Sequence, residues 1–336
     1  MLGKTIGAAA MGLALSVSIG AAAAEDLAKV RFGTNWLAQA EHGGFYQAVA
    51  DGTYRKYGLD VEIVQGGPQA NNGIALPAGK IDFYMGGNMI EGFSAVKEGV
   101  PIVTVAAIFQ KEPQILMSHP GVGMDTFEDL KKSNDILIGA DLMASGYQWM
   151  KAAYGFKEEQ TKPYNFNPAP FLADKMAVQQ GYLTSEPLAV EKEGGFKPNV
   201  FLLADYGFDT YSTTIVTRGE TVEKQPGLVQ KFVDASIIGW MNYLHGDNAA
   251  ANALIKKDNP DMTDEQIAYS IAQMKAYGIV ESGDTATLGV GAMTDARMKS
   301  FFDKMVQAGL FAADLDYKKS YTLQFVNRKV GSDLAK

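Results

Sequence analysis

The stretch from Phe32 to Pro68 constrains the fold more than any other part of the chain. A β-prone run over 30–34 stops at Asn35, and a polar turn follows it. We expect a helix over about 43–54 and then a second strand over 59–64, where apolar and polar residues alternate. A strand–helix–strand unit of this length predicts two parallel strands joined by a right-handed crossover.

Polar and aromatic residues follow the first predicted strand directly. Asn35, Trp36 and His42 lie between its carboxyl end and the N-terminus of the next helix. In open α/β sheets, ligands bind beyond the carboxyl ends of the strands. The polar neighbours of Trp36 favour a stacking surface over a place in the core. His42 either contacts the ligand or makes a structural hydrogen bond in the turn, and both interpretations stay open.

Three later strands are predicted to end in similar residues. A strand over 81–85 precedes Gly86-Gly87-Asn88, and one over 136–139 precedes Ser145. A helix over 170–180 is expected to lead into a strand over 182–184 that ends beside Glu186. The candidate ligand-binding residues are therefore Asn35, Trp36, His42, Tyr46, Gly87, Asn88, Ser145, Gly146, Tyr147, Glu186 and Asp209.

Glu186 gives the first indication of ligand chemistry. It stands between Ser185 and Pro187 at a predicted strand end, and therefore points into a crevice or into solvent. A carboxylate in an apolar crevice needs a partner. A bound amine or a heterocycle that donates hydrogen bonds supplies one.

The strand and helix pattern occurs twice, which predicts an α/β fold of two lobes with mixed, mostly parallel sheets. Lobe I comprises 25–112 and 206–336, and lobe II comprises 113–205, so the chain crosses between the lobes twice. We expect the lobes to close by hinge motion in these crossovers. The segment after Asp316 is polar and is expected to be loosely held.

The first 24 residues have the features of a secretory signal peptide. Lys4 precedes an apolar run over 6–19, and Ala22-x-Ala24 offers a cleavage site. The run is shorter than the roughly 20 residues that a membrane-spanning helix needs. We therefore expect cleavage near Ala24 and a periplasmic mature protein.

Composition excludes several classes of function. Without Lys4 the net charge goes from −8 to −9, which does not suit binding to nucleic acid. The chain has no cysteine, so disulfides, thiolate catalysis and a lipid anchor on cysteine are not expected. His42, His119 and His245 show no metal-binding spacing, and the common nucleotide-binding and hydrolase motifs are missing. We predict no metal, no cofactor and no catalytic residues.

Several short motifs carry a family resemblance that covers nearly the whole mature chain. They are Asn35-Trp36 with His42, Gly58-Leu-Asp-Val61, Gly79-Lys-Ile-Asp82, Glu186 and Val229-x-Lys231-Phe232. With these motifs the chain resembles the substrate-binding proteins of ABC importers, in the thiamine-pyrimidine-synthase-like branch that includes formylaminopyrimidine- and riboflavin-binding proteins. The resemblance implies that two lobes close over a ligand and that Asn35, Trp36 and Glu186 face the cleft.

The chain departs from the enzymes of this branch at two places. Where the eukaryotic synthases use an active-site histidine this chain has Glu91, and 208–211 replaces their cysteine-rich motif. We therefore expect a monomeric binding protein, not an enzyme, that passes a small heteroaromatic ligand to an ABC permease and ATPase. That ligand would resemble a thiamine pyrimidine precursor or a flavin.

Two alternatives remain. One is a binding protein for an oxyanion such as taurine, a sulfonate or nitrate, which an unpaired Glu186 would repel. The other is an enzyme of the pyrimidine-synthase type or a pyridoxal-phosphate-dependent variant.

Overall fold

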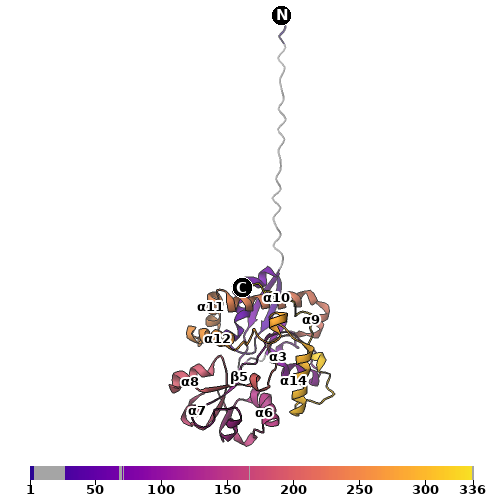
Figure 1. Cartoon of the computed structure of the whole chain (residues 1–336). Coiled ribbons are helices and arrows are strands. Elements are labelled where there is room, and N and C mark those ends of the chain that lie inside the picture. The colour runs from indigo at the N-terminus through magenta and orange to yellow at the C-terminus, as the bar shows by residue number, and fades with distance from the viewer. Residues whose placement is uncertain (4–26, 68–69, 71, 166, 335–336) are drawn as a thin grey trace.

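The computed structural model describes residues 1–3, 27–67, 70, 72–165 and 167–334 (Figure 1). Apart from 1–3, the predicted signal peptide lies outside these residues. The described chain forms two lobes, each built on one five-stranded sheet. Among the described residues, no helix combines the length and the hydrophobicity that crossing a bilayer requires.

The first sheet has the strand order β2-β1-β3-β10-β4. Its strands are β1 (Ala28–Gly33), β2 (Leu59–Val64), β3 (Phe83–Asn88), β4 (Ile102–Phe109) and β10 (Ser212–Arg218). The parallel pairing of β1 with β2, with Val30 opposite Val61, confirms the prediction from the opening stretch. β10 returns from the second lobe and runs antiparallel to both of its neighbours.

The second sheet repeats this plan in the order β7-β6-β8-β5-β9. Its strands are β5 (Gln114–Ser118), β6 (Ile136–Ile138), β7 (Thr161–Pro163), β8 (Val178–Tyr182) and β9 (Asn199–Leu202). β6 is parallel to β7 and β8, and β5 is antiparallel to β8 and β9. The prediction of two α/β lobes with mixed sheets is thus confirmed.

Helices of the described chain pack around the first sheet or extend from it: α1 (Gly43–Ala50), α2 (Thr53–Lys56), α3 (Asn72–Ala75), α4 (Met89–Glu98), α9 (Gly219–Lys224), α10 (Pro226–His245), α11 (Ala249–Asp258), α12 (Asp264–Ala276), α13 (Thr285–Leu288) and α14 (Asp295–Gln307). The apolar face of α10 forms the centre of this core. The ring of Phe232 stacks on Phe83 at 4.1 Å and on Tyr54 at 5.3 Å between ring centroids.

The helices of the second lobe are α5 (Ala140–Ala144), α6 (Gly146–Tyr154), α7 (Ala169–Ala173) and α8 (Glu186–Gly194). The predicted helix over 170–180 is wrong, because α7 ends at Ala173 and β8 begins at Val178. Residues 178–182 pair with β5 on one side and partly with β6 on the other, and this central place in a sheet outweighs their helical pattern. Glu186 is accordingly the first residue of a helix.

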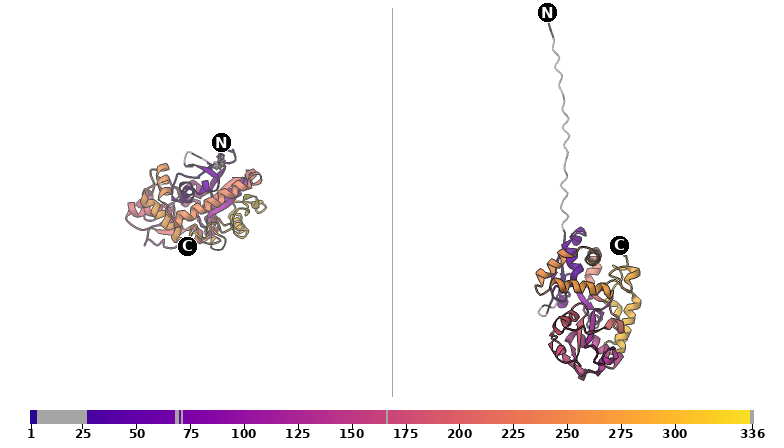
Figure 2. Two further views of the ribbon diagram at one scale, coloured as in Figure 1. Left: turned by 90° about the horizontal axis from the view of Figure 1, so that it is seen from above. Right: turned by 60° about the vertical axis from the view of Figure 1, so that its left-hand side comes forward.

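Two segments, 110–113 and 203–211, join the sheets. Arg297 of α14 binds both of them, because its guanidinium donates to the backbone carbonyls of Gln110 and Asp209. Phe301 of α14 packs edge-on against Phe208 in the second segment. Figures 1 and 2 show α14 running beside the junction of the two lobes. The bounds of lobe I and lobe II along the chain stay a prediction.

The segment after Asp316 is packed, and the expectation of a loosely held tail is wrong. Phe325 is 1% exposed and Tyr321 is buried as well. The amide of Thr322 donates to the carbonyl oxygen of Thr104 in β4 over 2.9 Å, which fixes the segment along the edge of the first sheet.

Candidate ligand-binding site

Contacts between the lobes bring together residues that follow β1, β3 and β8. Thr184, just after β8, donates its hydroxyl hydrogen to Glu41, which lies in the turn after β1. Tyr182, the last residue of β8, donates to Glu112 in the first crossing segment. Asn88 at the end of β3 lies next to Glu112. The carboxyl ends of these strands therefore meet at the junction of the lobes, where the sequence predicted a site.

Glu186 is held against the end of β8. The backbone N–H of Tyr182 donates to its Oε2 over 2.7 Å, and the hydroxyl of Tyr164 donates to Oε1 over 3.3 Å. A Cβ at residue 181 would lie 2.8 Å from the Cβ of Glu186, so Gly181 lets this side chain fold back on the strand. Burial raises the pKa of Glu186 above its ordinary value.

Glu41 is a carboxyl that sequence reasoning missed. It lies in the 3-10 helix Ala40–His42 and is 4% exposed. Burial raises its pKa to about 7; the hydrogen bond from Thr184 lowers it, and the charge of Glu186 adds to the rise. Two carboxyl groups from opposite lobes thus face the same region.

Glu112 is the second missed carboxyl, and it is also 4% exposed. Its Oε1 accepts the hydroxyl of Tyr182 over 2.9 Å, whereas its Oε2 makes no hydrogen bond with the described residues. Burial raises the pKa of Glu112 to about 7, and the nearby hydroxyl and amide groups of Tyr182, Ser212 and Asn88 oppose the rise. This carboxyl group lies where the chain crosses between the lobes.

Several predicted residues surround the end of β3. The side chain of Asn88 caps α4 by accepting the N–H of Ile90 over 3.0 Å. The carbonyl oxygen of Gly87 accepts the hydroxyl of Ser212 over 2.7 Å. A Cβ on Gly87 would lie 3.9 Å from the side-chain Nδ2 of Asn35, which places the Asn35 side chain beside this strand end. Trp36 follows it and is half-buried.

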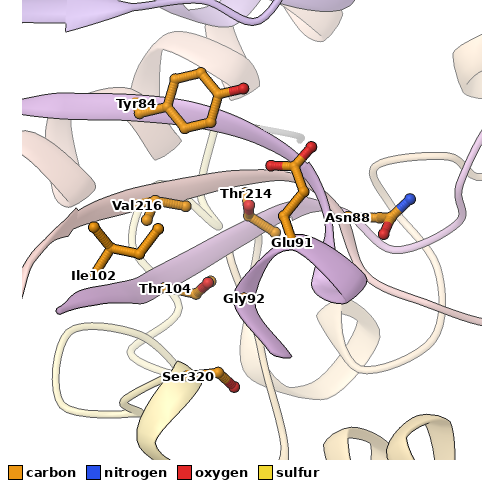
Figure 3. A pocket seen from close by; sticks show the side chains of 9 residues that line it. All are labelled: Tyr84, Asn88, Glu91, Gly92, Ile102, Thr104, Thr214, Val216 and Ser320. Carbon is orange, nitrogen blue, oxygen red and sulfur yellow. The ribbon is translucent and has the colours of Figure 1, made fainter. Parts of the chain in front are cut away.

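A small cavity lies next to these residues on the first sheet (Figure 3). Its lining combines hydroxyl groups, an amide, a carboxylate and apolar side chains: Tyr84, Asn88, Glu91, Gly92, Ile102, Thr104, Thr214, Val216 and Ser320. In Figure 3 the carboxylate of Glu91 points toward Tyr84, and the amide of Asn88 points away from it. The cavity adds another carboxylate next to the strand end.

Other predicted residues lie elsewhere. Tyr46 and Tyr147 are buried in the core, where their hydroxyls donate to Asp258 over 2.9 Å and to the carbonyl oxygen of Lys157 over 2.8 Å. Asp209 forms an ion pair with Lys304 at 2.8 Å. The structure does not bring these three side chains to the group around Glu186.

His42, Ser145 and Gly146 complete the predicted set. The ring of His42 is fully buried, and burial lowers its pKa to about 3, so it is neutral. Its ring nitrogens make no hydrogen bond with the described residues, so the turn hydrogen bond considered for it is not seen there. Ser145 and Gly146 lie at the junction of α5 and α6, after the end of β6.

The site is rich in hydrogen-bond acceptors. No lysine or arginine within the described chain forms an ion pair with Glu41, Glu112 or Glu186. The described residues also contain no cluster of histidines and carboxylates that could hold a metal ion. Ionised carboxylates are acceptors only, so the arrangement suits a molecule that donates hydrogen bonds or carries positive charge.

The two lobes, their sheet topology and the double crossing define the periplasmic-binding-protein fold that the sequence predicted. One solved structure of this fold, the alkanesulfonate-binding protein SsuA from Xanthomonas axonopodis pv. citri bound to MOPS, superimposes with a TM-score of 0.62. The superposition includes 88% of this chain and 99% of the SsuA chain, and the two sequences are 16% identical. The structure of the desulfurization enzyme DSZB superimposes with a TM-score of 0.59. This superposition includes 89% of this chain and 97% of the DSZB chain, and the sequences are 13% identical. At these identities the similarity concerns the fold alone.

The chain belongs to the NMT1/THI5-like family, whose model matches residues 39–250. Among curated proteins, it is similar to the riboflavin-binding protein RibY of Chloroflexus aurantiacus, with 24% identity over 316 residues. That alignment covers 89% of this chain and 86% of RibY. The family resemblance drawn from the short motifs is thus confirmed.

Proposed function

We propose that this protein is the solute-binding component of an ABC importer and carries a small heteroaromatic ligand to a permease and ATPase in the membrane. The ligand resembles a thiamine pyrimidine precursor or a flavin, and the protein works as a periplasmic monomer. The observation that carries the proposal is the group of carboxyls at the lobe junction, Glu41, Glu112 and Glu186, which has no basic partner among the described residues.

The chemistry of these groups supports a ligand with donors. An aminopyrimidine or a ring N–H donates to a carboxylate, and a hydrogen bond to a charged group contributes about 1.5–3 kcal/mol. Trp36 is half-buried at the end of β1, where an indole offers a flat face to a planar ring. The name of RibY, a riboflavin-binding protein, agrees with a planar heterocycle.

An oxyanion is the second candidate, because the fold is shared with an alkanesulfonate-binding protein. Anion sites rely on backbone N–H groups, hydroxyls or basic side chains. At this junction a sulfonate or nitrate would instead meet carboxyls from both lobes and no basic side chain of the described residues. An ionised Glu186 would repel the anion where water is excluded, whereas Glu41 and Glu112, with pKa values of about 7, are only partly charged near neutral pH. The acceptor-rich junction therefore favours the heterocycle.

An enzyme is the third candidate, because DSZB shares the fold. Glu91 stands where the related synthases have a histidine, and the chain has no cysteine for their cysteine-rich motif. Both departures favour a binding protein. A pyridoxal-phosphate Schiff base would give the purified protein a visible absorbance band, and we expect none.

Native mass spectrometry of protein purified without refolding tests the proposal. We expect a co-purified species with the mass of a heteroaromatic molecule. Titration calorimetry with riboflavin, an aminopyrimidine, taurine and nitrate then compares the classes directly. Binding of taurine or nitrate without any binding of the heterocycles would refute the proposed ligand class.

A further inference from the structure

Thr184 belongs to the second lobe and is hydrogen-bonded by three side chains of the first lobe. It lies in the turn between β8 and α8, two residues before Glu186, and is fully buried. Its hydroxyl donates to Glu41, and its carbonyl oxygen accepts Gln266 Nε2 over 2.8 Å and Ser270 Oγ over 2.7 Å. We refer to these four residues, Thr184, Glu41, Gln266 and Ser270, as the Thr184 node.

The node lies next to the first crossing segment, since the N–H of Leu183 donates to the carbonyl oxygen of Pro113 over 2.9 Å, but its own contacts are made to α12 and to the turn after β1. Both crossing segments are bound by Arg297 of α14, whereas the node joins α12 to the start of α8. Figure 1 shows α12 and α8 together on one side and α14 on the other. An ion pair between Lys192 of α8 and Glu265 of α12, at 2.5 Å, extends the same contact between the lobes.

Hydrogen bonds in this position act on the equilibrium between open and closed lobes. They join Glu41 and α12 of the first lobe to the turn after β8 in the second lobe, so an opening motion that moves this turn away from α12 breaks them. Any interaction made only in the closed form raises the population of that form and hence the apparent affinity for a ligand that binds it. A side chain that never touches the ligand can therefore tune binding.

We propose that the Thr184 node is a latch that holds the two lobes closed, and that closing it takes up a proton at Glu41. The proposal rests on the proposed function only in so far as closure encloses the ligand. It assigns to Glu41, Gln266 and Ser270 a positioning role, because they act through the turn that carries Glu186.

The surroundings of Glu41 give the sign of the proton effect. Glu186 on α8, Tyr182 on β8 and Tyr243 on α10 are the titratable groups that interact with it, and none is basic. The buried pKa of Glu41 is about 7, and exposure to water in an open cleft would return it toward its ordinary value of 4.5. Between these values the closed form holds the proton more tightly, so closure is favoured as the pH falls and weakened as it rises.

Spin-label distances in the ligand-free protein test the latch. Because the chain lacks cysteine, Lys175→Cys in lobe II and Glu223→Cys on α9, both exposed, give one labelled pair. All measurements use a Glu112→Gln background, since Glu112 titrates in the same range. We expect the closed population to grow between pH 8 and pH 5.

Four variants separate the parts of the latch. Thr184→Val loses the hydroxyl donor and should lower the closed-to-open ratio about 10-fold, the effect of one hydrogen bond near 1.4 kcal/mol. Gln266→Ala should lower the ratio in the same direction, whereas Gln273→Ala, the same change on the same helix, should not. Glu41→Gln keeps an acceptor for Thr184 and should remove the pH response.

Circular dichroism confirms that each variant is folded. A closed population unchanged in Thr184→Val and Gln266→Ala, or a pH response that persists in full in Glu41→Gln, would overturn the proposal. No ligand is present in these measurements, so a wrong ligand class leaves their result unaffected.

Discussion

Tyr182 donates its hydroxyl hydrogen to Oε1 of Glu112 over 2.9 Å, and this bond joins the end of β8 to the first crossing segment. The carboxyl is almost completely buried, yet its other oxygen has no partner among the described residues. Such a group is stable when protonated and costly when ionised. The carboxyl of Glu112 therefore binds its proton more tightly than an exposed glutamate does, and loss of this proton weakens the fold.

Folding stability should therefore fall as Glu112 loses its proton. Its folded pKa of about 7 is raised above the ordinary value of 4.5, so the folded state binds more protons than the unfolded state between these values. The contribution is fully present below about pH 4.5 and is lost as the pH rises to 7, by at most about 1.4 kcal/mol per pH unit. Glu112→Gln, which keeps an acceptor for Tyr182, should remove this part of the loss.

Urea unfolding at pH 5 and pH 8 measures the difference. The variant should gain stability relative to the wild type at pH 8 but not at pH 5, while the exposed control Glu223→Gln should show no such trend. Glu41 adds a similar slope, so the variant reduces the pH dependence without abolishing it. Identical pH dependence in wild type and Glu112→Gln would contradict the assignment.

Gly44 should tolerate no side chain. A Cβ at this position would lie 2.1 Å from Cγ of Trp240, which fills the space between α1 and α10. Gly44→Ala should destabilise the protein by roughly 1–3 kcal/mol or more, the usual range for overpacking a core. At Gly227, in the first turn of α10, a Cβ meets nothing within 4 Å.

Gly227→Ala is therefore the matched control. It should leave stability unchanged or raise it by up to about 1 kcal/mol, because alanine favours helix. Urea midpoints of the two variants decide the point, and equal effects would show that α1 and α10 do not pack as described.

Local patterns in the sequence were sufficient where local physics decides the structure. The parallel pair β1–β2 was predicted from the strand–helix–strand pattern of the opening stretch. The predicted helix over 170–180 failed because β8 takes its structure from strands distant in sequence. Phe325 was missed in the same way, since its burial depends on the first lobe and not on its neighbours.

The candidate site was only partly accessible from sequence for the same reason. Glu186 and Asn35 stand at turns that a strand pattern marks. Glu41 meets Thr184 across 143 positions, and Glu112 meets Tyr182 across 70. No local signal marks a glutamate that becomes buried only when two lobes meet. Tyr46 was a candidate through its place near a helix start, whereas core packing turned its ring toward Asp258.

Arg297 should hold the two crossing segments together. Its guanidinium donates to the carbonyl oxygens of Gln110 and Asp209 and lies 4.2 Å from the centre of the Tyr211 ring. Arg297→Met keeps the apolar stem but leaves those carbonyls unpaired, which should cost roughly 2–4 kcal/mol. Lys299→Met is the control on the same helix, because its ion pair with Asp303 is exposed.

Chemical denaturation of both variants measures the cost. Exposed ion pairs contribute at most about 1 kcal/mol, so the control should stay close to the wild type. An Arg297→Met protein as stable as the control would show that the crossing segments do not depend on this side chain.

Glu186 and Trp36 should each contribute to affinity without being needed for folding. We expect Glu186→Gln to weaken binding of a thiamine-pyrimidine-like or flavin-like heterocycle by roughly 10- to 150-fold. A hydrogen bond to a charged group contributes about 1.5–3 kcal/mol, and each 1.4 kcal/mol or so changes the dissociation constant tenfold. Trp36→Ala should weaken binding through lost stacking. Glu191→Gln, an exposed change on the same helix as Glu186, should bind like the wild type.

Titration calorimetry with riboflavin and an aminopyrimidine gives the affinities, and circular dichroism verifies folding. In the Glu186→Gln protein the side-chain amide oxygen still accepts the N–H of Tyr182, so the turn keeps its shape while the charge is gone. A loss of affinity in this variant is thus an effect of charge on the ligand. Unchanged affinity in a folded Glu186→Gln protein would remove the carboxylate from the binding site and, with it, the reason for preferring a donor heterocycle over an oxyanion.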